Sequence, residues 1–561
     1  MLASGVATAQ VPWGTRELRM QQTVVPATNS PGAIQAEPMP GVPRPYAAIH
    51  SAQTIVPPNS AGLEVGSLTA AGDVISADSK LSIADVTAST VRAFPLIEQA
   101  RLGSGVAAGE ITSARGFYDH KLQGYSLAQP MGYYQNYRTG IGVARQLWWG
   151  GYLSAGYRVG RGSFEPWYKE LETNKGGETK LSYVQPLLQG RAIDPARVAL
   201  FQAGLKQEAV GPEIQRSMLI YCYEAADVYW NWVALGSTLA AQEELLKLAQ
   251  TRASQLEELV AAGKNKAIDL IFNQQLLAER ELKVIETRQK YRELSVKLSL
   301  YLRDEIGSPL YPAPEWLPES FPKLEPLPPG DFDSDMAAAA TRRPELRLIS
   351  IDMQQVTWDL RLAQNQTLPQ LDWVSEASQD TGPRATPLND KGQFELDVGL
   401  QGEVPLQRRK ARGKIQSVQA KLAQLEQKYR FQQDKIAIEL KAARNALDQA
   451  ALGTAQAEAA LRASIETLDR FNFAFRQGQV DLVYINLLET KVTEYEIKLI
   501  ESQQKWFSAL ASMQAALGLD PIEQAINIST LPLSVVPTPN HLPSPAAGQP
   551  AEPATGKPQV Q

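Results

Sequence analysis

The sequence contains few of the residue types that most often carry chemistry in proteins. It has one cysteine, Cys222, among 561 residues, so a disulfide within the chain is excluded. Its histidines, His50, His120 and His541, are far apart in the sequence, which argues against a zinc site of histidine and cysteine. Lys and Arg number 55 against 60 Asp and Glu, and the net charge of −5 argues against a nucleic-acid binder held by bulk positive charge.

Long apolar runs are also missing. No stretch of about 18 consecutive apolar residues occurs, which excludes a transmembrane helix. Hydrophobic residues still make up 44% of the chain, enough to bury a large apolar surface. They recur as heptads along predicted helices and at every second position of predicted strands. Strands that span a membrane need apolar residues only at alternate positions, so a transmembrane β-barrel stays open.

The motifs of common enzyme classes are absent as well. The sequence has no phosphate-binding loop, no G-x-S-x-G and no H-E-x-x-H. Residues 103–108 loosely imitate a dinucleotide-binding turn, but they follow a helical pattern instead of a strand. Acidic pairs such as Glu243-Glu244 lie on predicted long helices, where solvated faces are the ordinary explanation. We therefore predict no enzyme activity, no metal site and no cofactor.

The N-terminal segment, residues 1–82, is predicted to be a flexible extension, because it is rich in Pro, Gly, Ser and Ala and lacks periodicity. Within it, Ala7-Thr8-Ala9 resembles the end of a secretory signal peptide. The basic start of such a signal would then lie upstream of Met1, and the protein would be exported. The alternative is an ordinary N-terminus of small residues.

The rest of the chain reads as two similar halves, residues 83–307 and 331–518, joined by a Pro-rich linker at 308–330. Each half has a helix, strands, a very long helix, a turn and a return helix. The predicted elements of the first half are a helix over 83–114, strands within about 115–188, a long helix over 195–262 and a return helix over 266–304. Those of the second half are a helix over 333–365, strands within about 367–406, a long helix over 408–474 and a return helix over 481–517. Closely spaced prolines predict a disordered tail at 519–561.

Matching positions give the offset of the repeat. Pro95 matches Pro344 at an offset of 344 − 95 = 249, and Gly263 matches Gly478 at 478 − 263 = 215. The difference, 249 − 215 = 34 residues, is additional chain in the first half. We place this insertion at about 135–165, where a surplus hairpin can be read.

The long helices need partners along their whole length. A helix over 195–262 would be about 100 Å long at ~1.5 Å per residue, far beyond the globular mean. Asp194-Pro195 is a strong start signal for it, because Asp caps the helix and Pro at the first position loses no hydrogen bond. The return helices supply apolar seams with heptad spacing, such as Ile485, Leu488, Val492, Tyr495 and Leu499.

The predicted strands alternate between apolar and polar residues. In the second half one face carries Phe394, Leu396, Val398 and Leu400, and the other carries Glu395, Asp397 and Gln401. In the first half Arg158 lies on the polar face of a similar strand. A soluble sheet packed on a core shows the same pattern, but rods of about 100 Å are poorly shaped to cover a small sheet. A barrel with the first set facing lipid and the second set facing a wet lumen fits better.

Aromatic residues gather beside the strands of the first half. They are Trp148, Trp149, Tyr152, Tyr157, Phe164, Trp167 and Tyr168. We interpret them as an interfacial belt, with core aromatics as the alternative. The few strands of one chain cannot close a barrel with an open lumen, so we predict a barrel shared between the chains of a cyclic homo-oligomer.

Residues 83–520 resemble the TolC-type outer-membrane efflux proteins. The resemblance is carried by LSYVQPLLQGRAIDPARVAL at 181–200, where a strand leads into a long helix, and by residues 473–518, which end in Ala-Leu-Gly. It implies a mainly α fold with β strands: a homotrimer whose duplicated long helical hairpins form a periplasmic α-barrel. It also implies four strands per protomer in a twelve-stranded outer-membrane barrel, and docking to a periplasmic adaptor and an inner-membrane pump.

The same resemblance places a periplasmic gate and the docking turns at the hairpin tips, around Gly263 and Gly478. There the sequence departs from the family. Phe475 stands where the family often has tyrosine, Val480 where it has the gate arginine, and Tyr484 and Leu487 where it has acidic residues. We expect the polar residues near the tips, Lys264, Lys266, Asp269, Arg476 and Asp481, to replace the usual latch. The alternative is that they are solvated turn residues.

A different class of function stays open from the sequence: a coiled-coil scaffold with a small β domain and no channel. Within the channel class, the sequence does not separate export of small molecules from export of polypeptides, because the pump and adaptor select the cargo.

Overall fold

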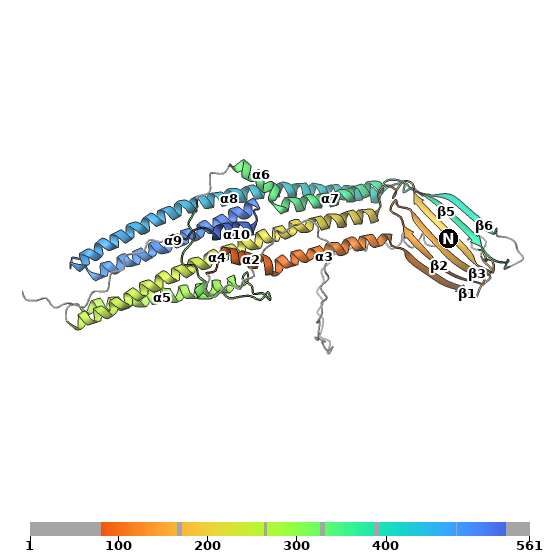
Figure 1. Cartoon of the computed structure of the whole chain (residues 1–561). Helices are drawn as coiled ribbons and strands as arrows, with labels where there is room; N and C mark the ends of the chain where they lie inside the picture. Colours follow the sequence, from red (N-terminus) through yellow and green to blue (C-terminus); the bar gives the residue numbers. More distant parts are fainter. Residues whose placement is uncertain are drawn as a thin grey trace, which may run out of the picture.

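The computed structural model describes residues 80–164, 171–262, 266–325, 331–385, 392–477 and 479–534. It is an elongated molecule with long helices side by side at one end and a β-sheet at the other (Figure 1). The predicted aromatic residues Trp167 and Tyr168, the tip residues Gly263, Lys264 and Gly478, and most of both predicted flexible ends lie outside the described residues.

The helices of the first half are α2 (Ile83–Ala93), α3 (Pro95–Arg115), α4 (Pro195–Ala261) and α5 (Ala267–Leu298). Those of the second half are α6 (Phe332–Arg342), α7 (Pro344–Asn365), α8 (Arg409–Arg476), α9 (Leu482–Leu517) and α10 (Pro521–Ser529). A proline interrupts the first predicted helix of each half, because the residue before proline is forced out of the helical region. Phe94 and Arg343 accordingly have ψ angles of 124° and 118°.

One prediction for the C-terminal segment is wrong. Residues 519–561 were expected to hold no helix, yet α10 occupies Pro521–Ser529. Pro521 is at the first turn, where its missing N–H is not needed, and the carboxylate of Asp520 accepts a hydrogen bond from the amide of Ile522 at 2.8 Å. The next proline is Pro532, so a short helix has room to form. The return helix α5 also ends earlier than expected, at Leu298 instead of Asp304.

Each long helix packs against its own return helix, and the two hairpins meet where α4 packs against α9 (Figure 1). Asp194 caps α4 as expected, since its carboxylate accepts a hydrogen bond from the Arg197 amide at 2.8 Å. The helix continues through Pro212 to Ala261.

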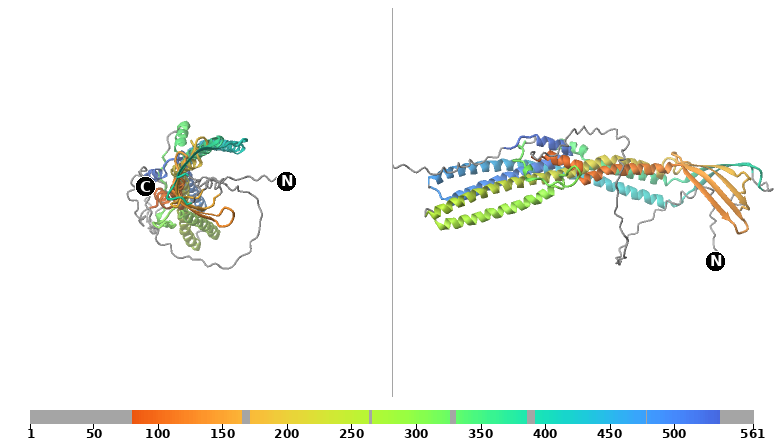
Figure 2. Two further views of the ribbon diagram at one scale, coloured as in Figure 1. Left: turned by 90° about the vertical axis from the view of Figure 1, so that its right-hand side faces the viewer. Right: turned by 60° about the horizontal axis from the view of Figure 1, so that its bottom comes forward.

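A six-stranded antiparallel sheet follows the chain order β1-β2-β3-β4-β5-β6. Its strands are β1 (Lys121–Gln129), β2 (Asn136–Gln146), β3 (Tyr152–Gly162), β4 (Glu178–Pro186), β5 (Gln370–Asp380) and β6 (Phe394–Glu403). Seen from its end, the sheet is an open arc with β6 at one end and the strands of the first half at the other (Figure 2). The resemblance implied four strands per protomer, so the described residues hold two more than that.

The insertion in the first half is the hairpin of β2 and β3. Strand β5 starts 370 − 121 = 249 residues after β1, but β6 starts only 394 − 178 = 216 residues after β4. The offset therefore falls between β1 and β4, where β2 and β3 lie, which confirms the predicted insertion at about 135–165. Gly150 makes the tight turn of this hairpin: its φ is +91°, and a Cβ there would lie 2.6 Å from the Gly190 carbonyl oxygen.

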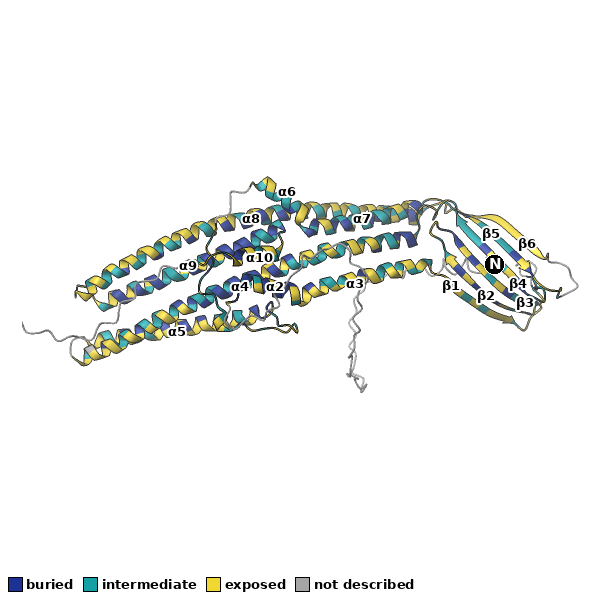
Figure 3. Ribbon diagram, viewed as in Figure 1, coloured by how far each residue is buried: buried dark blue, intermediate teal, exposed yellow. Residues whose placement is uncertain are grey.

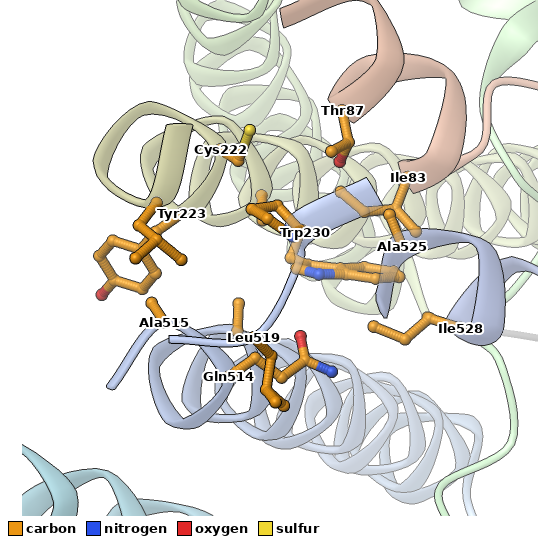
Figure 4. A pocket seen from close by; sticks show the side chains of 14 residues that line it. Ile83, Thr87, Cys222, Tyr223, Trp230, Gln514, Ala515, Leu519, Ala525 and Ile528 are labelled. Atoms are coloured by element: carbon orange, nitrogen blue, oxygen red, sulfur yellow. The ribbon is translucent and has the colours of Figure 1, made fainter. Parts of the chain in front are cut away.

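The largest core lies midway along the helices, where α2, α4, α9 and α10 meet. The ring centroids of Trp230 and Phe507 are 4.3 Å apart, and Phe321 of the linker stacks on both rings. Close to them, an apolar cavity of about 40 Å³ is lined by side chains from all four helices, among them Cys222 and Ile528 (Figure 4). This belt joins both halves and the linker into one unit.

Among the helices in the described ranges, none combines the length and the apolar composition that a membrane span requires.

The reactivity of Cys222 tests the packing of this belt. Its side chain is 3% exposed, and burial raises the pKa of its thiol to about 12. We expect a thiol reagent at pH 8 to react at least ~1,000-fold more slowly with the folded protein than with denatured protein, where the pKa is about 8.5.

Ser254→Cys, at an exposed position of α4, is the control and should react at once in the folded state. Equally rapid modification of Cys222 in the native protein would contradict the packed belt.

Candidate functional site

The tips of the two helical hairpins carry the predicted site residues. Lys266 precedes α5, Asp269 is in its first turn, and Asp481 precedes α9. Asp269 and Asp481 line one cavity together with Leu256, Phe272, Asn273, Leu482, Val483 and Asn486. The cavity holds only about 10 Å³, the space of a single water, so it marks a close contact between the hairpins and not a ligand pocket.

The remaining predicted residues of the tip lie apart from this contact. Phe475 and Arg476 form the exposed end of α8. Tyr484 is 43% exposed, and its ring lies 5.0 Å from that of Phe471. Within the described residues, Arg476 and Asp481 form no ion pair with each other. Their role as a latch stays a prediction.

A buried polar cluster lies next to the tip contact, and the sequence analysis missed it. Arg252 of α4 forms an ion pair with Glu489 of α9 and donates a hydrogen bond to the Asn486 side chain at 3.1 Å. Arg280 of α5 donates to the Leu245 carbonyl of α4 at 3.2 Å and to the Thr490 hydroxyl of α9 at 3.1 Å. We call Arg252, Arg280, Asn486, Glu489 and Thr490 the latch cluster. It ties both helices of the first hairpin to the return helix of the second.

The latch cluster buries charged side chains away from water. It places two guanidinium groups beside one carboxylate, and Arg280 and Glu489 are each 5% exposed. Burial lowers the pKa of Arg280, while Glu489 opposes that shift. Burial raises the pKa of Glu489, while both arginines oppose that shift. In the described part of the chain, the Nε of Arg280 has no hydrogen-bond partner. Burial outweighs the pairing in both shifts, so the ion pairs offset only part of the desolvation cost.

Heptad spacing could have located this cluster. The apolar seam of α5 recurs every seven residues through Leu277 and Val284, and Arg280 takes the intermediate seam position. On α9, a second seam faces α4 with alternating spacings of three and four: Asn486, Glu489, Thr493, Glu496, Ile500, Gln503, Phe507 and Leu510. Polar residues at seam positions are the signal, because such positions are normally apolar.

Between the latch cluster and the belt, the contact of α9 with α4 contains two like charges. Glu496 of α9 faces Glu244 of α4, and burial followed by the Glu244 charge raises the pKa of Glu496. The contact between the hairpins is therefore apolar at the belt, repulsive at Glu496 and ionic at the latch cluster.

At the opposite end of the molecule, strand register sorts the sheet residues into two faces. Opposed residues share a face, so Leu122, Ile141, Tyr157, Leu181, Ala377 and Leu396 all lie on one side. The predicted lipid-facing residues Phe394, Leu396, Val398 and Leu400 are on this side and are 58–68% exposed. Between its two ends this face carries no charged residue.

The other face is polar. It holds Arg158, which forms a buried ion pair with Glu178, and the predicted lumen-facing residues Glu395, Asp397 and Gln401. Lys180 and Glu376 pair on the same face. Their position on the lumen side stays a proposal.

The predicted aromatic residues divide between two environments. Trp148 and Trp149 are about half exposed at the turn nearest the helices, where the Trp148 ring lies 6.2 Å from Phe201 of α4. Tyr157 is exposed on the apolar face. Tyr152 is only 9% exposed and lies on the polar face, so its assignment to a belt is wrong, because it directly precedes Leu153 of the apolar face.

The charge on Glu496 gives a pH-dependent prediction. The pKa of Glu496 is higher in the folded protein than its ordinary value of 4.5. At a pH above 4.5 the carboxylate ionises more readily in the unfolded chain, so Glu496 lowers the free energy of unfolding there and has no such effect at lower pH. We expect Glu496→Gln to raise the unfolding temperature of the detergent-solubilised protein by a few degrees at pH 8 and to leave it unchanged at pH 4.

The neighbouring Glu494, whose side chain is 43% exposed, supplies the matched control, and Glu494→Gln should have little effect at either pH. An equal shift at both pH values for Glu496→Gln would contradict a raised pKa of Glu496 in the folded protein.

No protein-family model matches the sequence, and no curated protein sequence matches it significantly. Solved structures do match: 23 chains are similar.

Three of these structures illustrate the likeness. The open state of the MtrE outer-membrane channel of Neisseria gonorrhoeae is 13% identical with a TM-score of 0.58, over 78% of this chain and 89% of that one. The outer-membrane protein VceC of Vibrio cholerae is 14% identical with a TM-score of 0.55, over 78% and 96%. A membrane protein of Pseudomonas aeruginosa is 15% identical with a TM-score of 0.57, over 78% and 93%.

Several of the matched structures, MtrE among them, are described as outer-membrane channels. Their resemblance to this chain covers the helical hairpins and the sheet together, since it spans more than three quarters of the chain. The chain therefore has the fold of the outer-membrane channels, as its resemblance to the TolC-type outer-membrane efflux proteins predicts.

Proposed function

We propose that this protein is the outer-membrane channel of an efflux system, and that it works as a homotrimer. The observation that carries the proposal is the sheet. Its strands are 9–11 residues long, the length that spans a bilayer at a tilt, and one face is charge-free between its ends. The described helices cannot cover that face, because they extend away from the sheet (Figure 1).

The helical end supports a tunnel across the periplasm. Helix α4 has 67 residues and α8 has 68, so each is about 100 Å long. Rods of this length need neighbours on both flanks, and much of α5 and α8 is exposed (Figure 3). Exposed apolar side chains, such as Leu282 and Ile285 on α5 and Phe431 and Ile438 on α8, mark the flanks where other protomers would pack.

The hairpin tips are the proposed docking site for the periplasmic adaptor, which would connect the channel to an inner-membrane pump. In this proposal the latch cluster holds the tips of each protomer together at rest. Separation of α9 from α4 would break the Arg252–Glu489 ion pair, and the repulsion between Glu244 and Glu496 would favour that movement.

Channel formation is tested by reconstituting the purified protein into planar bilayers. We expect heat-modifiable trimers in detergent and discrete conductance steps. A protein that carbonate extracts from membranes and that shows no conductance would support the scaffold alternative.

Removal of one partner from the latch cluster should open the channel at rest. In Glu489→Gln, the largely buried Arg252 and Arg280 would lose the carboxylate that they share, and breaking a buried pair in this way costs about 3–5 kcal/mol. We expect a resting conductance at least ~10-fold higher, since 1.4 kcal/mol is already tenfold in an equilibrium.

Glu494→Gln, on the same helix but in an exposed pair, is the control and should not change conductance. Asp481→Ala and Arg476→Ala test the latch predicted from the sequence. Wild-type conductance in Glu489→Gln, with a raised value in these two, would move the latch to the turn residues.

A further inference from the structure

The sheet ends in two strands that each have an open edge. In the described part of the chain, β1 pairs only with β2 and β6 pairs only with β5. Nearly all of β6 is exposed, including four large apolar side chains that are 58–68% exposed. An exposed, apolar edge strand of this length invites pairing with another strand.

A second copy of the chain offers a fitting partner for β6. The sheet has an even number of antiparallel strands, so β6 of one protomer would run antiparallel to β1 of the next. Both strands have one apolar and one polar face, and they have almost equal lengths of 9 and 10 residues. The open arc in Figure 2 leaves both edges accessible.

Charge also favours this pairing. The polar face of β6 carries Glu395, Asp397 and Glu403, whereas that of β1 carries Lys121 and no acidic residue. Lys121 begins β1 next to α3, and Glu403 ends β6 next to α8, so both lie at the end of the sheet nearest the helices. An antiparallel pair of these strands brings the two charges to the same level of the barrel.

We infer that β6 of each protomer pairs with β1 of the next, and that the trimer forms a barrel of 3 × 6 = 18 strands instead of twelve. The inference rests on the proposed trimeric channel. The inserted β2–β3 hairpin supplies the additional strands, and the outer-membrane segment is consequently wide enough for solutes much larger than a twelve-stranded barrel of the same tilt admits.

Simple geometry gives the size of the effect. With strands ~4.8 Å apart and tilted by ~40°, eighteen strands give a backbone diameter of about 36 Å, and twelve give about 24 Å. Side chains of ~5 Å on each wall leave lumens of about 26 Å and 14 Å. Four helices of each protomer, α3, α4, α7 and α8, meet the sheet. A ring of twelve helices ~10 Å apart has a diameter of about 38 Å, which the wider barrel matches.

Disulfide trapping tests the pairing of β1 with β6. Val398→Cys on β6 is combined in separate variants with Gly124→Cys, Ser126→Cys or Ala128→Cys on the same face of β1, which covers neighbouring registers. Cys222 is buried and does not interfere. At least one variant should give covalent trimers in SDS under oxidising conditions.

The matched control is Val398→Cys with Ser375→Cys, whose Cα atoms are register partners within one chain. It should cross-link without an increase in mass. Failure of all three β1–β6 variants, or cross-links confined to one chain, would overturn the eighteen-stranded barrel while a conducting trimer upheld the proposed function. Absence of both trimer and conductance in the wild type would overturn both.

Deletion of the inserted hairpin provides a second measurement. Replacing residues 130–177 by Asn-Gly joins β1 directly to β4 as an antiparallel hairpin, with Gln129 and Glu178 both on the polar face. In bilayers, polymers are added from the barrel side. The largest polymer that enters the wild-type channel should have roughly twice the diameter of the largest polymer that enters the variant. The same cutoff for both channels would contradict a wider native barrel.

Discussion

The packing of α4 against α9 is the constraint on which the rest of the molecule depends, because it holds the two long hairpins together from the belt to the tips. Its composition changes along its length. At the belt, Trp230 and Phe507 bury large aromatic rings, and burial of such rings stabilises strongly. Toward the tips, Glu496 and the latch cluster replace apolar residues. The contact between the hairpins is therefore aromatic and apolar in the middle, and polar and ionic toward the tips.

The sheet meets a different constraint, because one of its faces is apolar and exposed. Its face from Leu122 to Leu400 is apolar and uncovered, which is costly in water and favourable in lipid. The duplicated plan contributes β1, β4, β5 and β6, and the insertion widens the sheet by β2 and β3. The long helices of the two halves, by contrast, have closely similar lengths, so the insertion widens the sheet and leaves the helices alike.

Much of this fold could be predicted from the sequence. Proline and aspartate at helix starts, heptads along the rods and alternation in β6 are local patterns, and each has a direct physical cause. The offset between Pro95 and Gly263 and their counterparts even located the inserted hairpin. The breaks at Phe94 and Arg343 could have been read from the prolines that follow them.

The site was predicted less well, because it depends on contacts between segments far apart in the sequence. Arg252 and Glu489 are separated by 237 residues, and neither belongs to a recognisable motif. Of the two turn residues that sequence position favoured, Asp481 lines the cavity between the hairpins, whereas Arg476 lies apart from it at the exposed end of α8. The interpretation of Tyr152 as a belt residue relied on its aromatic character alone, whereas its position in β3, one residue before Leu153, places it on the polar face.

The claim that one face of the sheet meets lipid is tested most directly by fluorescence quenching. A small fluorophore is attached to cysteines introduced singly from Glu395 to Gln401 of β6, and the protein is reconstituted into brominated lipid. The account predicts strong quenching at positions 396, 398 and 400 and weak quenching at the positions between them. Uniform quenching, or none along the whole strand, would contradict it.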